Sequence, residues 1–334
     1  PSQACTGITL TAKDSTRILA RTIEWGGSDL NSCYVVVPRG YTVQSYVPGG
    51  QDGMKFTAKY GYVGLSVEQK EFVAEGLNEK GLSAGLFYFP NYGQYEAYKA
   101  EWKSSSIADL QLVSWVLGNC QTVDEVMESL KQVHVVAIDP RASTVHWRFA
   151  DVSGRQVVLE IVDGQLHFYE NELGVLTNSP GFEWQLTNLN NYVNLYAGSA
   201  QPQEFGKLTL RSFGAGSGFL GMPGDVTPPS RFVRAAFYQT TAPQQENAHQ
   251  TVLQGFQILN NFDIPVGKIP ANIPSATQWT SATDMRHRMI YFRTMYNASI
   301  RSIDLNKIDF QRVKYRAVPL DTVKEQPVME VSIR

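Results

Sequence analysis

The chain has few cysteines, no long apolar run and no concentration of positive charge. Three cysteines in 334 residues are an odd number and too few for a disulfide framework. With a formal net charge of −2 and no run of lysine and arginine, a nucleic-acid-binding surface is not expected. The nearest approach to a membrane span, residues 110–117, is too short and is interrupted by Gln111 and Ser114. We therefore expect a protein that neither binds nucleic acid nor spans a membrane.

Patterns typical of metal sites, repeats and linkers are missing as well. The five histidines are scattered, and no set of cysteines and histidines has the spacing of a zinc site. We expect no metal and no other cofactor. Hydrophobic residues make up 43% of the chain, enough to bury a large core as one domain or two. Because no internal repeat and no proline- or serine-rich linker divides the sequence, we expect residues 5–334 to form a single domain.

One cysteine stands near the start of the sequence, in the segment Ser2-Gln3-Ala4-Cys5. A small-x-Ala tripeptide is what a signal peptidase leaves at its cleavage edge, so we expect residues 1–4 to be the remnant of an export signal or propeptide. The protein would then be periplasmic or extracellular. Cleavage after Ala4 would free the α-amine of Cys5, whose pKa of about 8 lets it accept the thiol proton. The alternative is a cysteine that only begins the first strand.

The segment after Cys5 has the pattern of a β-hairpin. Residues 8–12 alternate apolar and polar side chains, residues 13–15 form a turn, and residues 18–25 return as the second arm. This arm can bring Arg21 and Glu24 beside Cys5. There a guanidinium would lower the pKa of the thiol, and a carboxylate would hold and orient the amine. The alternative is that Arg21 and Glu24 form a solvated pair on the hairpin surface.

Four short blocks carry a recognisable pattern, in order along nearly the whole chain. The first joins Cys-Thr-Gly-Ile, which begins at Cys5, to Ala-Arg-Thr-Ile-Glu-Trp at residues 20–25; the others are residues 76–82, 174–180 and 221–232. Together they resemble the choloylglycine hydrolase family, which contains conjugated bile acid hydrolases and penicillin V acylases. The resemblance implies the N-terminal nucleophile hydrolase fold, an α+β four-layer αββα sandwich of two antiparallel sheets between helical layers. Periodicity alone predicts only an α+β fold.

The resemblance also implies a set of catalytic residues. Cys5 matches the nucleophile, Arg21 matches the arginine beside it, and Glu24 falls where many members carry an aspartate that binds the α-amine. Asn178 matches the asparagine whose side-chain amide helps to form the oxyanion hole. Arg231 matches a second arginine that stabilises charge near the nucleophile. Outside this context Asn178 is typical of a turn, and Arg231 is typical of the exposed start of a helix.

One family segment, Ala-Gly-Leu-Asn-Phe-Pro, is matched less well. Residues 84–90 read Ala-Gly-Leu-Phe-Tyr-Phe-Pro, with one residue more and no asparagine. Alignment on the final Phe-Pro places Tyr88 at the asparagine position, which is similar to penicillin V acylases. The backbone N–H near Tyr88 would supply the second oxyanion donor. This departure leaves the substrate open between conjugated bile acids and penicillin V.

The expected function is hydrolysis of the amide bond of glycine- or taurine-conjugated bile acids through a thioester. Such a substrate presents a broad apolar body and a small anionic head, so its pocket should be wide and apolar. Besides Tyr88, we expect the pocket to be lined by aromatic side chains that can equally belong to the core: Trp25, Tyr62, Phe87 and Phe89. Penicillin V acylase is the alternative function. A third hypothesis is a non-catalytic binding protein of the same fold, which a titration of the active-site thiol would distinguish.

Periodicity predicts the remaining elements coarsely. A capping-box pattern at Ser106 opens a helix that reaches residue 117, and further helices are expected over residues 122–131, 184–195, 230–238 and 248–260. Strands are expected over residues 145–149, 157–162, 166–169 and, as a late hairpin or meander, 281–303. Residues 192–213 resemble an extension that mediates tetramer assembly in bile acid hydrolases, so we expect a homotetramer. Cys33 and Cys120 are expected to be buried thiols.

Overall fold

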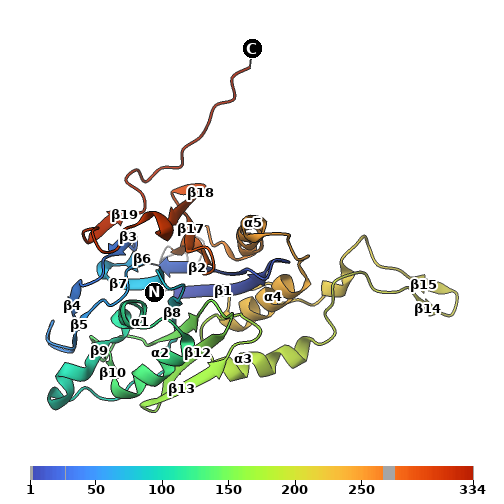
Figure 1. Cartoon of the computed structure of the whole chain (residues 1–334). Coiled ribbons are helices and arrows are strands. Elements are labelled where there is room, and N and C mark those ends of the chain that lie inside the picture. Colours follow the sequence, from blue (N-terminus) through green and yellow to red (C-terminus); the bar gives the residue numbers. More distant parts are fainter. Residues whose placement is uncertain (1–2, 27, 266–274, 334) are drawn as a thin grey trace.

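The computed structural model describes residues 3–26, 28–265 and 275–333, and two antiparallel sheets form its centre (Figure 1). The first sheet has the strand order β1-β2-β16-β17-β18. Its first two strands are the hairpin that the alternation after Cys5 predicts, and its last three are the predicted late meander, which begins earlier than expected. The bounds are β1 (Gln3–Thr11), β2 (Arg17–Gly26), β16 (Ser275–Asp284), β17 (Met289–Thr294) and β18 (Asn297–Asp304).

The second sheet has eight strands in the order β13-β12-β11-β8-β7-β6-β3-β19. The meander predicted around residues 145–169 is confirmed as β11, β12 and β13, and Asp163 and Gly164 have the positive φ angles that a tight hairpin turn requires. The bounds are β3 (Cys33–Val37), β6 (Tyr62–Val67), β7 (Gln69–Asn78), β8 (Ser83–Tyr88), β11 (Val145–Ala150), β12 (Gln156–Val162), β13 (Gln165–Glu170) and β19 (Arg316–Pro319).

Helices cover the outer faces of both sheets. Helices α4 (Pro228–Thr241) and α5 (Ala248–Leu259) pack on the first sheet, and α1 (Leu112–Asn119) and α2 (Val123–Ser129) pack on the second. Between them, β1 contacts β8 across the two sheets. The order of layers is therefore helices, sheet, sheet, helices, as the expected αββα sandwich requires. The first turn of α4 contains two prolines, which suit this position because their missing N–H groups have no helical partner there.

The helix predicted from Ser106 begins later than expected, which corrects the capping-box interpretation. Ser106 lies in a short strand, β9 (Ser106–Ala108), which pairs in parallel with β10 (His134–Val136). Its hydroxyl donates to the backbone oxygen of Trp102 at 2.8 Å and so caps no helix. A 3₁₀ turn follows, and α1 begins at Leu112. Thr122 does cap α2, because its hydroxyl accepts from the Glu125 N–H at 3.1 Å.

Short elements complete the described chain. They are β4 (Thr42–Gln44), β5 (Lys55–Thr57), α3 (Phe182–Asn188), β14 (Gln203–Phe205), β15 (Leu208–Leu210) and the 3₁₀ turns Ala100–Ser105, Asp109–Gln111, Leu130–Gln132, Leu189–Tyr192, Ser217–Phe219, Asn260–Phe262 and Leu305–Lys307. The hairpin β14–β15 extends away from the sheets, as does the segment after β19 (Figure 1). Within the ranges that the structure describes, no helix has the length and apolar character needed to cross a bilayer.

Candidate active site

Cys5 lies near the start of β1, buried between the two sheets. Its side chain is 3% exposed, and the β1–β2 register pairs Cys5 with Ile23, Ala4 with Glu24 and Gly7 with Arg21. On the other edge of β1, the Gly7 N–H donates to the Leu176 oxygen at 2.7 Å. That bridge brings the segment after Leu176 alongside the nucleophile candidate. In this chain β1 begins before Cys5, so the Cys5 nitrogen is a peptide nitrogen.

Asn178 and Arg231 join Cys5 in one hydrogen-bonded group. The Cys5 N–H donates to Asn178 Oδ1 at 3.0 Å, and Asn178 Nδ2 donates to the Tyr88 oxygen at 2.7 Å. From the first turn of α4, Arg231 donates through Nη2 to Asn178 Oδ1 at 2.7 Å and through Nη1 to the Cys5 oxygen at 2.5 Å. Both side chains are buried, so Asn178 is more than a turn residue and Arg231 is not the exposed start of a helix.

Arg21 lies on the same face of the hairpin as Cys5 and is fully buried. Its Nη1 donates to the Leu86 oxygen at 2.6 Å and lies 3.2 Å from Glu75 Oε2, while its guanidinium carbon stands 3.9 Å from the centre of the Phe87 ring. These partners hold the buried Arg21 guanidinium in place. The alternative of a solvated surface pair with Glu24 is therefore wrong.

Glu24 is buried on β2 opposite Ala4, and its two carboxylate oxygens differ in their hydrogen bonding. Oε1 accepts from the Thr277 hydroxyl at 3.1 Å, whereas Oε2 has no hydrogen-bond partner among the residues that the structure describes. Burial raises the pKa of Glu24 to about 7, opposed chiefly by the Arg231 guanidinium. A buried oxygen without a donor is suited to receive one, and an ammonium on the Cys5 nitrogen would be such a donor.

The electrostatic surroundings of the Cys5 thiol act in both directions. Burial raises its pKa, and the Arg21 guanidinium opposes this most strongly. The Glu24 carboxylate also raises the pKa, while a hydrogen bond from the Tyr88 N–H and the charge of Arg231 lower it. A backbone N–H near Tyr88 stays the expected second donor for an oxyanion.

A pocket of about 410 Å³ opens beside Cys5. Trp25 and Tyr88 line it as expected, and the Tyr88 hydroxyl donates to Ser143 Oγ at 2.7 Å. Most of the other lining residues could not be predicted, because alternation along a strand does not reveal which face of the strand meets a cavity. They are Ile23, Leu30, Val67, Glu68, Phe72, Leu86, Leu110, Ala142, Ser143 and Val145.

Three aromatic residues that were expected to line this pocket lie elsewhere. Phe87 points to the opposite face of β8 from its neighbours and packs under Arg21. Phe89 is buried and stacks on His146, with ring centres 4.4 Å apart. Tyr62 is buried in β6, where burial raises its pKa to about 12. These corrections share one cause: all three side chains fill space inside the sandwich.

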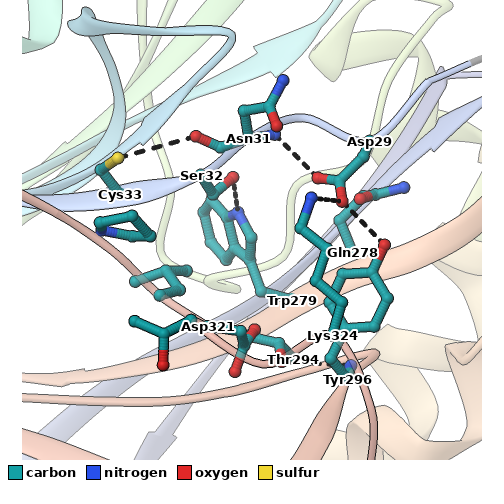
Figure 2. Close-up of a pocket in the computed structure, with 13 residues that line it drawn as sticks. Asp29, Asn31, Ser32, Cys33, Gln278, Trp279, Thr294, Tyr296, Asp321 and Lys324 are labelled. Carbon is teal, nitrogen blue, oxygen red and sulfur yellow. Dashed lines mark hydrogen bonds and ion pairs between the residues drawn. The ribbon is translucent and has the colours of Figure 1, made fainter.

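A second cavity, of about 500 Å³, lies apart from Cys5 (Figure 2). Its polar groups pair with one another, since Asp29 accepts from Lys324 Nζ at 2.6 Å and from the Tyr296 hydroxyl at 2.7 Å. Cys33 also lines it and is half-buried, which corrects the expectation of a buried thiol; Cys120 is buried as expected. None of the six candidate catalytic residues borders this cavity.

Comparisons with known proteins point in one direction. The chain is 32% identical over 311 residues to the bile salt hydrolase/transferase of Clostridium perfringens, covering 91% of this chain and 93% of that protein. It is 26% identical over 329 residues to the penicillin V acylase of Pectobacterium atrosepticum, covering 91% and 81%. A solved cysteine-to-alanine mutant of the conjugated bile acid hydrolase from Clostridium perfringens matches with a TM-score of 0.85 and 29% identity, covering 98% of this chain and all of that one.

The chain has two antiparallel sheets between helical layers and matches this solved structure closely. Its fold is therefore the N-terminal nucleophile hydrolase fold. Over residues 5–318 the chain also matches the linear amide C–N hydrolases of the choloylglycine hydrolase family. The protein belongs to this family and is an amidase that hydrolyses linear amides.

Proposed function

We propose that this protein hydrolyses the amide bond of glycine- or taurine-conjugated bile acids, with Cys5 as an N-terminal nucleophile. The observation that carries the proposal is the hydrogen-bonded group of Cys5, Asn178 and Arg231 beside an apolar pocket. Apolar walls suit the broad, rigid body of a bile acid. The relative named bile salt hydrolase/transferase supports the same substrate class.

Removal of residues 1–4 supplies the base. The freed α-amine, with a pKa near 8, accepts the Cys5 thiol proton near neutral pH. Its nitrogen starts 3.0 Å from Asn178 Oδ1 and next to the strand position of Glu24. Asn178 Oδ1 and Glu24 Oε2, which has no hydrogen-bond partner in the described part of the chain, can then hold the resulting ammonium in place.

The reaction follows in two halves. The thiolate adds to the amide carbon, forming the C–S bond, and the carbonyl oxygen becomes an oxyanion that Asn178 Nδ2 and the Tyr88 N–H stabilise. The ammonium then gives its proton to the leaving nitrogen as the C–N bond breaks, releasing glycine or taurine and leaving a thioester. The same amine takes a proton from water, which attacks the thioester carbon. Breaking the C–S bond releases the bile acid and restores the Cys5 thiol.

Penicillin V acylase is the second candidate, and Tyr88 is the observation that favours it. An aromatic side chain stands where the bile acid hydrolases of the family are expected to carry asparagine, and it lines the pocket beside Cys5. The relative from Pectobacterium atrosepticum supports this alternative. Both candidates use the same chemistry.

The deciding experiment compares taurodeoxycholate, glycodeoxycholate and penicillin V on one purified sample whose N-terminal residue is established by mass spectrometry. We expect higher kcat/KM for the bile salts, at least a roughly thousandfold loss in Cys5→Ala, and wild-type turnover in the matched variant Cys33→Ala. Faster cleavage of penicillin V would select the alternative. No turnover of any substrate, with Cys5 no more reactive than Cys33, would identify a non-catalytic binding protein.

Assembly and location complete the proposal. Residues 192–213 include the projecting β14–β15 hairpin, which would join four copies into a homotetramer (Figure 1). The enzyme would be exported to the periplasm or the cell exterior, because a tripeptide of the kind that a signal peptidase leaves stands before Cys5. Cell fractionation tests the location: activity confined to the cytoplasmic fraction would contradict it.

A further inference from the structure

A buried arginine that the mechanism does not use lies beneath the Cys5 strand. Arg148, on β11, is 1% exposed, and none of its three side-chain nitrogens has a hydrogen-bond partner among the described residues. The carboxylate beside it is Glu75, whose Oε2 lies 3.8 Å from Arg148 Nη2. Burial lowers the pKa of Arg148 to about 10, so the side chain stays charged at neutral pH. A buried charge without hydrogen bonds is costly, and its presence here calls for a reason.

The position of Arg148 relative to Cys5 follows from Gly7. A Cβ on Gly7 would lie 2.8 Å from Arg148 Nη1 and 3.0 Å from Phe87 Cζ, so the missing side chain makes room for both. Side chains two residues apart on a strand share one face, at a spacing of roughly 7 Å. The Arg148 guanidinium therefore lies against β1 at Gly7, which is the next position after Cys5 on the same face of the strand.

Arg21 shares this face, because it pairs with Gly7 across the hairpin. Glu75 lies between the two arginines: its Oε2 is 3.2 Å from Arg21 Nη1 and 3.8 Å from Arg148 Nη2. One carboxylate thus serves two guanidiniums. The triad of Arg21, Glu75 and Arg148 carries one net positive charge, buried beside the thiol.

The other titratable groups near Cys5 do not cancel this net positive charge. Glu24 from β2 and Arg231 from α4 also face Cys5, and because the pKa of Glu24 is about 7 its partly ionised carboxyl adds no net negative charge to this pair. His146, on the same face of β11 as Arg148, is bonded to Glu160 Oε1 at 3.2 Å and to the Thr177 oxygen at 3.0 Å. No further carboxylate contacts Arg148 among the described residues.

We propose that Arg148 is a positioning residue for the nucleophile. Its buried positive charge, for which Gly7 leaves room and which has no carboxylate of its own among the described residues, stabilises negative charge on Cys5 Sγ. It acts through its field and touches no substrate. At roughly 7 Å in a site shielded from water, one charge changes the ionisation of a neighbouring thiol by about tenfold or more. The inference deepens the proposed function, yet it concerns only the reactivity of Cys5 and does not depend on the substrate.

The test measures the rate of Cys5 alkylation by iodoacetamide against pH, read on the Cys5 peptide by mass spectrometry. Arg148→Met keeps the length of the side chain and removes its charge. We expect alkylation at pH 7 to fall about tenfold, with the midpoint of the profile about one pH unit higher. Glu75→Gln removes the shared carboxylate and should move the midpoint downward. The double variant restores the net charge of the triad and should return close to wild type.

The matched control is Arg312→Met, which removes the same charge from an exposed side chain and should leave the profile unchanged. An unchanged midpoint in folded Arg148→Met would overturn the proposal. If that variant does not fold, a midpoint in Glu75→Gln that stays or rises overturns it instead. Failure to cleave bile salts together with the expected alkylation shifts would contradict the proposed function and leave this inference standing.

Discussion

At the scale of single residues, Asn178 is the point where the hydrogen bonds of the site converge. Its Oδ1 accepts from the Cys5 N–H and from Arg231, and its Nδ2 donates to the Tyr88 oxygen. These three hydrogen bonds hold the Asn178 side chain in one orientation beside Cys5. A donor fixed before the reaction costs no reorganisation when the oxyanion forms.

We expect Asn178→Ala to lower kcat by roughly 10²–10³ with little change in KM, because the lost donor acts only in the transition state. Steady-state kinetics on a bile salt measures both constants. Asn190→Ala, which removes an exposed asparagine, is the matched control and should behave as wild type. An effect on KM alone would make Asn178 a substrate-binding residue.

Glu24 predicts a dependence of stability on pH. Its pKa in the folded chain is about 7, against about 4.5 as a free side chain, so the native state holds a proton that the unfolded state has lost between these values. Its contribution to stability is therefore complete below pH 4.5 and is lost as the pH rises through 7. In the chain that retains residues 1–4, Glu24→Gln should stabilise at pH 8 by up to about 3 kcal/mol and change nothing near pH 4.

Thermal unfolding of both proteins at the two pH values checks this. Removal of residues 1–4 should reverse the effect at pH 8, because the new ammonium would pair with the Glu24 carboxylate. A stabilising Glu24→Gln in the processed protein would show that Glu24 does not bind the amine.

Tyr88 predicts specificity. Its side chain lines the pocket that Cys5 also borders, and its hydroxyl donates to Ser143, so it occupies part of the space near the nucleophile candidate. Tyr88→Asn should raise the ratio of bile-salt to penicillin V kcat/KM, because it removes bulk and supplies the polar group of the family. Tyr88→Phe keeps the bulk and should leave the ratio near wild type. If Tyr88→Asn also leaves it unchanged, another residue selects the substrate.

Candidate members of the site could be named from the sequence through the family resemblance, but the residues that contact them could not. Cys5, Arg21 and Asn178 stand in motifs, whereas Glu75 and Arg148 meet them only because two sheets pack face to face. The aromatic residues show the same limit. A strand alternates its faces, and the pattern of Phe87 and Tyr88 alone does not tell which of the two meets the pocket.

At the scale of elements, β1 depends on close packing at Gly7. Gly7→Ala would place a methyl group within 3.0 Å of Arg148 and Phe87 side-chain atoms, and overpacking of a tight core costs about 1–3 kcal/mol. We expect a lower free energy of unfolding by this amount in urea denaturation. Gly118→Ala, whose new Cβ would meet neighbours at 3.4 Å or more, is the control and should be close to neutral. A neutral Gly7→Ala would show that the sheets can separate at this point.

Elements with a clear local period were predictable, and those decided by distant pairing were not. The β1–β2 hairpin and the β11–β13 meander follow from alternation and turn residues. Ser106 shows the opposite case. Its capping-box pattern favours a helix locally. The segment is nevertheless a strand, because β9 pairs with β10, which lies about thirty residues further along the chain.

At the scale of the whole molecule, the β14–β15 extension presents apolar side chains to solvent. Val193, Phe205, Leu208, Phe213 and Leu220 are all exposed, on a segment that leaves the body of the protein (Figure 1). An exposed apolar patch of this kind marks a surface for association. It is the structural reason to expect that the proposed tetramer forms through residues 192–213.

If the proposed tetramer forms, we expect the double variant Leu208→Ser/Phe213→Ser to convert it to smaller species, measured as molar mass by light scattering during gel filtration at micromolar concentration. The control, Val328→Ser/Met329→Ser, removes a comparable exposed apolar surface from the segment after β19 and should remain tetrameric. Dissociation by the control alone would transfer the interface to that segment. A monomeric wild type would contradict the tetramer outright, and because Cys5 and its partners all come from one chain, amidase activity should survive in either case.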